Sequence, residues 1–329
     1  PSLNYDTGVN TAIQHMIGNR PSASNYFDGS MSHFHFIDGT AYDASTFGES
    51  DSVSSIWKPK TAPSVTYGTN GFFLKFENSG AMGTDSSGNS NTFTVNGTLT
   101  QNVDTPSNNF CTLNPNDRAI TGTAPTLANG NLTFTSSGAG AGSNNAVRST
   151  LGVSKGKWYW ESKWLLSYTV WGMQDADTLT RWNSDGYWWV ATGSFGASNI
   201  GDITVNGTQT SSVFTALSTN DIVGFAYDLD NSKFYVSVNG VYVTSGDPTS
   251  GATGTGSLGN LTAGKTYVPI IGNSSYNSVS SANLNFGNGY FGTTAVASAN
   301  ADDGGLGAME YDVPANYRVL CTKNIKDYG

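Results

Sequence analysis

The chain has 329 residues and a formal net charge of −9, with 12% charged residues and 40 Gly. Acidic residues are scattered and no basic patch is present, so we expect no nucleic-acid partner. No apolar run approaches the ~20 residues that cross a bilayer, so no membrane insertion is expected. The 16 Tyr, 16 Phe and 8 Trp supply enough apolar area for a core and exclude a disordered chain.

Residues 1–103 carry strand-like stretches separated by turns. In "HFHF", His33 and His35 share one strand face, as two ligands of one metal could. No Cys or third His is near them in sequence, so we expect ordinary solvent-facing His. "DSSGN" (85–89) and, later, "DLDNS" (228–232) offer oxygens for Ca²⁺, but neither fits the spacing of an EF-hand loop. Asx turns explain both more simply, and we expect neither metal nor cofactor.

The stretch "DTPSNNFCTLNPND" (104–117) combines two Pro with several Asn between strand-like regions. The length of the chain favours two domains, so we interpret 104–117 as a junction between residues 1–103 and residues 118–329. Cys111, at this junction, and Cys321, near the C-terminus, are too few for a disulfide scaffold. The first and last strands of a sandwich can be adjacent, which leaves a disulfide conceivable, but we expect two free, buried thiols.

The stretch "GKWYWESKW" (156–164) holds three of the eight Trp. Trp158, Trp160 and Trp164 fall on one face of the predicted strand, and Tyr159 and Glu161 fall on the other. Because a two-sheet sandwich buries one face of each strand, we interpret the Trp face as core. The opposite set would pack under a loop or a neighbouring subunit. A platform on which a sugar stacks is the alternative for this strand.

A second aromatic cluster lies in "WGMQDADTLTRWNSDGYWWVATG" (171–193). Its middle, 175–186, is polar and loop-like. Flat aromatic faces beside Asp and Arg suit the binding of saccharides, and function concentrates in loops on rigid scaffolds. The alternative is a long loop whose aromatics only pin it to the sandwich. The candidate ligand-binding residues are Trp171, Arg181, Trp182, Asp185 and Tyr187.

Residues 221–243, "DIVGFAYDLDNSKFYVSVNGVYV", give the clearest strand signal. Apolar and polar residues alternate over 234–239, and Asn239-Gly240 suits a type I′ turn. "DLDNSK" joins this hairpin to an earlier strand, so the stretch predicts a three-stranded antiparallel meander. The small-residue runs at 136–145 and 246–260 have no apolar pattern and predict exposed, mobile loops. Helical periodicity is nearly absent, and the fold class is all-β with two antiparallel β-sandwiches.

The ordered set of motifs after residue 110 resembles a SPRY (B30.2-like) domain. That family has an early Gly-Lys-x-Tyr-Trp-Glu strand, a later Asp-x-Val-Gly strand with an acidic turn, and a strand that ends in Asn-Gly. The matching residues here are Gly156, Lys157, Tyr159, Trp160, Glu161, Asp221, Val223, Gly224, Asp228, Asn239 and Gly240. The resemblance implies a sandwich whose rim loops form a binding surface.

The first third is similar to the latter half of a laminin-G/concanavalin-like domain. The similarity rests on the stretches "NYFDGSMSHFHFIDGTAY" (25–42), "YGTNGFFLKFENS" (67–79) and "DSSGNSNTFTVNG" (85–97). The opening strands of such a sandwich are not present in 1–103. We expect residues 1–103 to be completed by further residues or by a neighbouring chain, because unpaired strand edges would otherwise remain.

The order of the two parts, ending in "VPANYRVLCTKNI" (313–325), resembles virion proteins of tailed bacteriophages. The resemblance implies a structural and adhesive role in a tail fibre, spike or head appendage, assembled in the host cytoplasm and exposed on the virion surface. It implies other virion proteins, a homo-oligomer of three or more copies, and a host surface glycan or receptor as partners. The alternative is a secreted bacterial adhesin or extracellular filament subunit with lectin-like domains.

Catalysis has little support in the sequence. Concanavalin-like glycosidases carry closely spaced Glu and Asp on one strand, and no Glu-x-Asp-x-Glu pattern occurs here. We therefore expect a protein that is not an enzyme.

Overall fold

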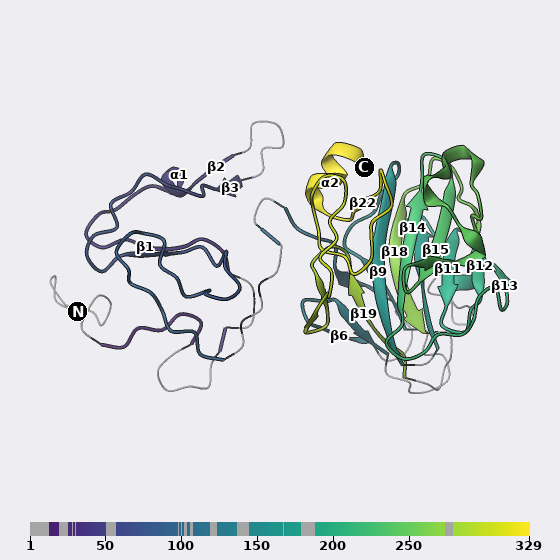
Figure 1. Ribbon diagram of the computed structural model, residues 1–329, viewed down its shortest axis with the longest axis horizontal. Coiled ribbons are helices and arrows are strands. Elements are labelled where there is room, and N and C mark those ends of the chain that lie inside the picture. Colours follow the sequence, from purple (N-terminus) through teal and green to yellow (C-terminus); the bar gives the residue numbers. More distant parts are fainter. Residues whose placement is uncertain are drawn as a thin grey trace. The chain divides into compact units, whose positions relative to one another are not determined.

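The computed structural model describes residues 13–19, 26–27, 29, 31–50, 57–97, 99, 101, 104–105, 108–118, 124–136, 145–166, 168–178, 188–273 and 279–329. The chain divides into two compact units, which we describe separately (Figure 1). The first unit comprises residues 1–101 and 105–107, and the second comprises 102–104 and 108–329. Residues 113–117 of the predicted junction belong to a strand of the second unit, Leu113–Arg118.

The described residues of the first unit form two small antiparallel sheets and one short helix. β1 (Phe34–Phe36) pairs with β4 (Phe72–Leu74), and β2 (Gly48–Ser50) pairs with β3 (Trp57–Pro59) after α1 (Ala44–Phe47). The laminin-G-like sandwich predicted for 1–103 therefore stays a prediction. The Asx turn predicted at 85–89 is confirmed, because one Asp85 oxygen accepts the Ser87 N–H at 2.9 Å.

The second unit is a β-sandwich of two antiparallel sheets, which confirms the all-β prediction. One sheet contains, in spatial order, β13 (Thr208–Thr210), β12 (Ile203–Val205), β11 (Ser194–Ser198), β10 (Thr169–Asp175), β18 (Tyr267–Asn273), β8 (Ala146–Ser149) and β5 (Leu113–Arg118). The other contains β16 (Val241–Tyr242), β15 (Lys233–Val238), β14 (Ile222–Asp228), β9 (Lys157–Leu166), β19 (Ser281–Asn285), β7 (Thr133–Thr135) and β6 (Thr126–Ala128). β17 (Gly259–Asn260) pairs with β15, and β22 (Arg318–Val319) pairs in parallel with β9.

The shorter elements lie between and after these strands. They are η2 (Trp188–Val190), η3 (Val243–Ser245), η4 (Pro248–Thr253), β20 (Tyr290–Phe291), β21 (Thr294–Ala295) and α2 (Thr322–Tyr328). In the part of the chain that the structure describes, no helix is long and apolar enough to span a bilayer.

The Trp-rich strand, for which the sequence left a core face or a sugar platform as alternatives, lies in the core between the two sheets. Trp158 and Trp160 of β9 are fully buried there, together with Trp171 of β10 from the facing sheet. Trp160 stacks on Phe225 at a centroid distance of 4.3 Å. The interpretation of this Trp face as core is confirmed for Trp158 and Trp160, and Trp164 is partly buried against the same core.

The other face of β9 is also buried. Tyr159 packs in a second cluster with Tyr317, Val319 and other residues near the C-terminus, and Glu161 beside it has no exposed surface. The strand is therefore covered on one face by the facing sheet and on the other by the C-terminal segment. Of the two predicted covers for Tyr159 and Glu161, a loop or a neighbouring subunit, the structure shows the first, supplied by the C-terminal segment of the same chain.

The predicted meander is confirmed. β14 pairs with β15 and β15 with β16, and the Asn239-Gly240 turn has φ values of 48° and 79°. Two positive φ values are what a type I′ turn requires, and Asn and Gly tolerate them at low cost. The loop predicted at 246–260 instead contains η4 and β17, and Pro248 in it is buried. Of the other predicted loop, 137–144 lie outside the described residues.

Both cysteines are free and buried, as expected. Phe110 and Cys321 form an isolated antiparallel β-bridge, so the two ends of the unit lie side by side. Cys111 follows Phe110 and therefore points to the opposite face of the sheet. Its thiol lies in the core between the sheets, whereas Cys321 lies in the second cluster. Adjacency in the sheet thus places the two thiols on different faces.

Candidate functional site

One of the five residues predicted to bind a ligand cannot reach the surface. Trp171 lies in β10, which is flanked by β11 and β18, and its side chain is fully buried between the sheets. The prediction is corrected at this position, because a ring in the core cannot stack on an external ligand. Arg181, Trp182, Asp185 and Tyr187 lie outside the described residues, and a binding site on them stays a prediction.

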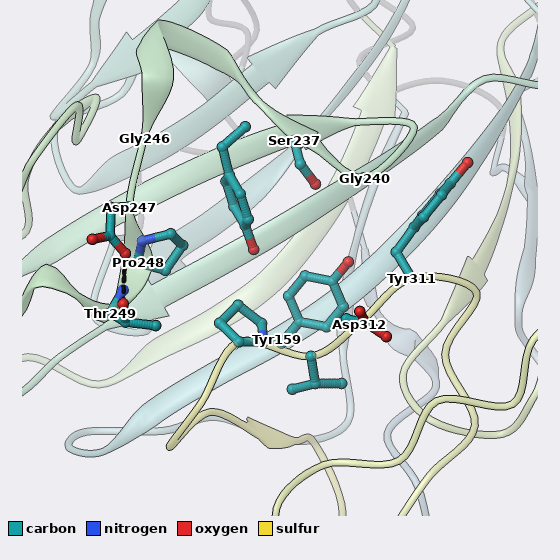
Figure 2. A pocket seen from close by; sticks show the side chains of 12 residues that line it. Tyr159, Ser237, Gly240, Gly246, Asp247, Pro248, Thr249, Tyr311 and Asp312 are labelled. Carbon is teal, nitrogen blue, oxygen red and sulfur yellow. Dashed lines mark hydrogen bonds between the residues drawn. The ribbon is translucent and has the colours of Figure 1, made fainter.

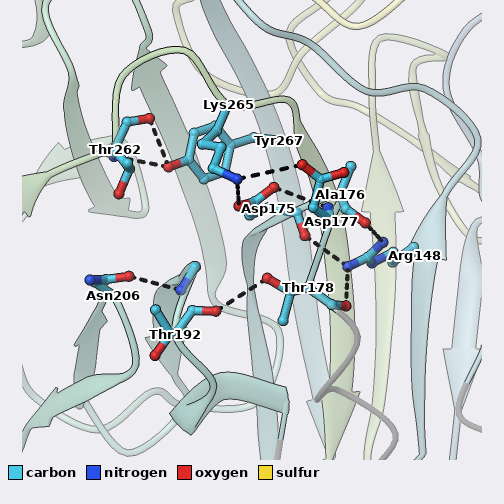
Figure 3. Close-up of polar contacts among 11 residues, drawn as sticks. Arg148, Asp175, Ala176, Asp177, Thr178, Thr192, Asn206, Thr262, Lys265 and Tyr267 are labelled. Atoms are coloured by element: carbon cyan, nitrogen blue, oxygen red, sulfur yellow. Dashed lines mark hydrogen bonds and ion pairs between the residues drawn. The ribbon is translucent and has the colours of Figure 1, made fainter.

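A buried polar cluster holds the residues that lead into this loop (Figure 3). The Arg148 guanidinium, on β8, donates to Gln174 Oε1 at 2.8 and 3.2 Å. It also donates to the carbonyl oxygens of Asp175, Ala176 and Thr178 at 2.9, 3.0 and 3.3 Å. A planar guanidinium with five N–H donors can satisfy several carbonyls at once. Arg148 therefore anchors the end of β10 and the turn after it.

Two further contacts complete this cluster. Lys265 Nζ lies 3.0 Å from Asp175 Oδ2 and 3.4 Å from Asp177 Oδ2. Thr178 Oγ1 donates to the Thr192 carbonyl at 3.2 Å. Asp175 and residues 176–178 are thus held by Arg148 and Lys265, and Thr178 is bound to Thr192.

A well-defined cavity lies elsewhere, between β16, η4 and the C-terminal segment (Figure 2). It is a groove of about 490 Å³, within the range of small-molecule sites. Its lining comprises Tyr159, Ser237, Gly240, Tyr242, Gly246, Asp247, Pro248, Thr249, Tyr311, Asp312, Val313 and Pro314. We call this feature the Tyr311 groove.

Local sequence explains one wall of the groove. Asp247 caps η4 by accepting the Thr249 N–H at 2.9 Å, and Pro248 occupies the first helical position, which needs no N–H donor. Tyr317 then donates its hydroxyl to the Pro248 carbonyl at 3.2 Å. This hydrogen bond ties η4 to the C-terminal segment that forms the opposite wall.

The Tyr311 ring belongs to that opposite wall. A Cβ at Gly240 would lie 2.6 Å from a Tyr311 ring carbon, so the ring rests directly on the Asn239-Gly240 turn. Only Gly permits both this approach and the φ of 79° at residue 240. The hairpin turn recognised in the sequence therefore also seats an aromatic side chain of the groove.

The groove presents hydrogen-bond acceptors beside its aromatic rings. Asp247 and Asp312 are both exposed on its walls. The Thr249 hydroxyl and backbone N–H lower the pKa of Asp247, which keeps it ionised. One buried hydroxyl oxygen on the lining, Tyr242 Oη, has no hydrogen-bond partner among the described residues. Buried hydroxyls are rarely left in this state, so this one indicates unused hydrogen-bonding capacity at the groove.

Below the groove, Glu161 acts as an acceptor for three donors. Its Oε1 accepts the Tyr159 hydroxyl at 3.0 Å and the Tyr311 N–H at 2.9 Å, and its Oε2 accepts the Glu310 N–H at 2.8 Å. Burial raises the pKa of Glu161 to about 7, against the opposing effect of these hydrogen bonds. Glu161 does not itself line the groove; Tyr159 does.

The described residues offer little for metal chemistry. No three His, Cys, Asp or Glu side chains among them gather as a metal site requires. His35 was expected to face solvent, and the structure corrects this. Its ring stacks on Phe73 with 3.9 Å between centroids, and its Nδ1 lies 2.9 Å from the Tyr67 hydroxyl. Burial lowers the pKa of His35 to about 4. Asp228 bonds to Asn231 and to Lys157, so the second predicted Ca²⁺ alternative is also explained by turn and ion-pair contacts.

No protein-family model matches the chain, and no curated protein matches it. Among solved structures, the chain is similar to the SPRY domain of human HERC1, with a TM-score of 0.40 and 14% identity over 52% of this chain and 96% of that one. It is similar to the PSpry domain of TRIM65, with a TM-score of 0.40 and 12% identity over 54% of this chain and 89% of that one. It is also similar to stonustoxin, with a TM-score of 0.38 and 19% identity over 53% of this chain but only 27% of that one. At these values the likeness carries no argument about function, and the all-β fold rests on the structure itself.

Sequence reasoning did not find the Tyr311 groove. Its two walls come from 246–249, interpreted as part of a featureless loop, and from 311–314, which carried no strand pattern. The available signal was local: Asp247-Pro248 is a capping pair, and Tyr311-Asp312 places an aromatic beside an acid. Neither signal shows that the two segments meet across β15 and β16.

Proposed function

We propose that the chain is a structural and adhesive protein without catalytic activity, whose second unit binds a saccharide in the Tyr311 groove. The observation that carries this proposal is the composition of the groove: aromatic rings and exposed carboxyl groups share one cavity of about 490 Å³. Sugar rings present C–H faces that pack on aromatics and hydroxyls that donate to carboxylates. A concave site with a few convergent polar groups is the usual form of a small-molecule site.

The non-enzymatic part of the proposal draws on the environment of Glu161. Among the described residues, this is the carboxyl whose pKa is raised to about 7, a value suited to a general acid. Its two oxygens already accept three hydrogen bonds, and it has no exposed surface. A group closed off in this way has a positioning role more readily than a catalytic one.

The biological setting comes from the sequence. The similarity to virion proteins of tailed bacteriophages supports a tail fibre, spike or head appendage on the virion surface, with other virion proteins as neighbours. A saccharide contact of this size is weak by itself, and a homo-oligomer would raise the avidity by ~10²–10⁴. The same groove would serve a secreted bacterial adhesin, which remains the second candidate.

The test begins with a glycan array probed with the full chain, followed by calorimetric titration of the best saccharide. We expect Tyr311→Ala and Asp312→Asn each to weaken binding at least about tenfold, the loss of about 1.4 kcal/mol. Asp327→Asn removes an exposed carboxylate outside the groove and serves as the matched control. Unchanged affinity in both groove variants, with unchanged melting temperatures, would refute a saccharide site here.

A further inference from the structure

One buried carboxylate connects the floor of the Tyr311 groove to its wall. Glu161 accepts the N–H groups of two consecutive residues, Glu310 and Tyr311, at 2.8 and 2.9 Å. The wall of the groove, residues 311–314, begins at the second of these two residues. The third donor is the hydroxyl of Tyr159, and Tyr159 also lines the groove. Glu161 thus holds the wall without touching the space where a ligand would lie.

We propose that Glu161 is the positioning residue of the Tyr311 groove, and that its ionisation controls how firmly the 310–314 wall closes over β9. The inference rests on the proposed function only for its consequence, the binding of a ligand. The contact between Glu161 and the wall is a property of the chain alone. It can therefore be tested in the absence of any saccharide.

The groups around Glu161 determine which ionisation state the closed wall favours. On its own strand lies Tyr159, on β16 lies Tyr242, and on the wall lie Glu310 and Tyr311. None of these is a cation, and Glu310 raises the pKa of Glu161 further. On the neighbouring strands, the residues directly opposite Glu161 are the uncharged Gly224 and Asn285. Removal from water therefore raises the pKa of Glu161 by more than the three hydrogen bonds lower it.

Proton linkage then gives the direction of the effect. An open wall would return Glu161 to water and to the ordinary carboxyl pKa of 4.5, whereas closure raises the pKa to about 7. The closed state binds the proton more tightly, so its advantage is complete below 4.5 and is lost as the pH rises through 7. With these two values, closure weakens about tenfold between pH 6 and pH 8.

Hydrogen exchange of the full chain tests this directly. Protection of the Glu310 and Tyr311 amides, corrected for intrinsic exchange rates, should fall about tenfold from pH 6 to pH 8. The Asn239 amide, which donates to the Ile222 carbonyl, is the internal control and should not change. Equal corrected protection of the two wall amides at both pH values would overturn the proposal.

Two variants separate positioning from simple structural support. Glu161→Gln keeps the shape but has no titrating group, so the change between pH 6 and pH 8 should disappear. Tyr159→Phe keeps the carboxylate but removes a donor that lowers its pKa, so the midpoint should move to higher pH. If Glu161→Gln fails to fold, an unmoved midpoint in Tyr159→Phe would still overturn the proposal.

The exchange data distinguish this proposal from that of saccharide binding. A pH-dependent wall in a chain that binds no saccharide would leave the role of Glu161 standing and remove the proposed function. Saccharide binding in the groove with a pH-independent wall would support the proposed function and remove the role of Glu161.

Discussion

Replacing Arg148 by Met is the most demanding test of the second unit, because one side chain there satisfies several buried groups. Arg148 is 3% exposed, and its loss leaves Gln174 Oε1 and three carbonyl oxygens without that donor. Met fills much of the volume of the stem, so the cost is mainly polar. An unsatisfied buried acceptor costs about 1–3 kcal/mol.

Water can reach some of these acceptors, which reduces the total. The bonds to Ala176 and Thr178 are only partly buried, whereas those to Gln174 and Asp175 are fully buried. Two fully buried acceptors at about 1–3 kcal/mol each give a loss of about 2–6 kcal/mol, to which the other two acceptors add less.

Urea unfolding followed by Trp fluorescence measures this loss in the correct unit, since every Trp except Trp57 belongs to the second unit. Arg318→Met is the matched control. Arg318 lies 3.8 Å from the half-exposed Asp303 and 4.6 Å from the centroid of the Tyr328 ring, and each such contact contributes about 1 kcal/mol or less. A loss below about 1 kcal/mol for Arg148→Met, equal to that of the control, would refute the anchoring role of Arg148.

Two further outcomes follow from the same structure. Both thiols should react slowly with a disulfide reagent in the native chain and rapidly in urea. Cys111 and Cys321 are buried, and burial raises the pKa of each thiol. Fast labelling of the native chain would contradict their placement. Gly240→Ala should weaken saccharide binding at the groove, because the new Cβ meets the Tyr311 ring at a backbone φ of 79°. Gly88→Ala, at a positive φ with open space around it, controls for backbone strain, and equal affinity in the two variants would argue against the contact with Tyr311.

The sequence predicted those features that depend on local pattern. Period-two alternation and Asn239-Gly240 identified the β14–β16 meander, and the even spacing of Trp158 and Trp160 identified a core face. Such signals require only neighbours along one strand, which is why they could be interpreted without a structure.

The errors concern residues whose environment is set by distant segments. Trp171 was grouped with the loop that follows it, but its position in β10 between two neighbouring strands places it in the core. The groove depends on contacts such as Tyr317 to Pro248 and Tyr311 to Gly240, which join residues about 70 positions apart. No local periodicity reports such contacts, so the candidate site could not be predicted even though its hairpin turn was.

Ligand binding in the Tyr311 groove is tested most directly by the backbone amide chemical shifts of the full chain. During titration with the saccharide selected by the array, we expect shift changes to concentrate at 246–249 and 311–314, the two walls of the groove. Changes confined to the residues around Arg181 and Trp182 would contradict binding in the groove and favour the aromatic loop instead. The absence of any saturable change would contradict saccharide binding by this chain altogether.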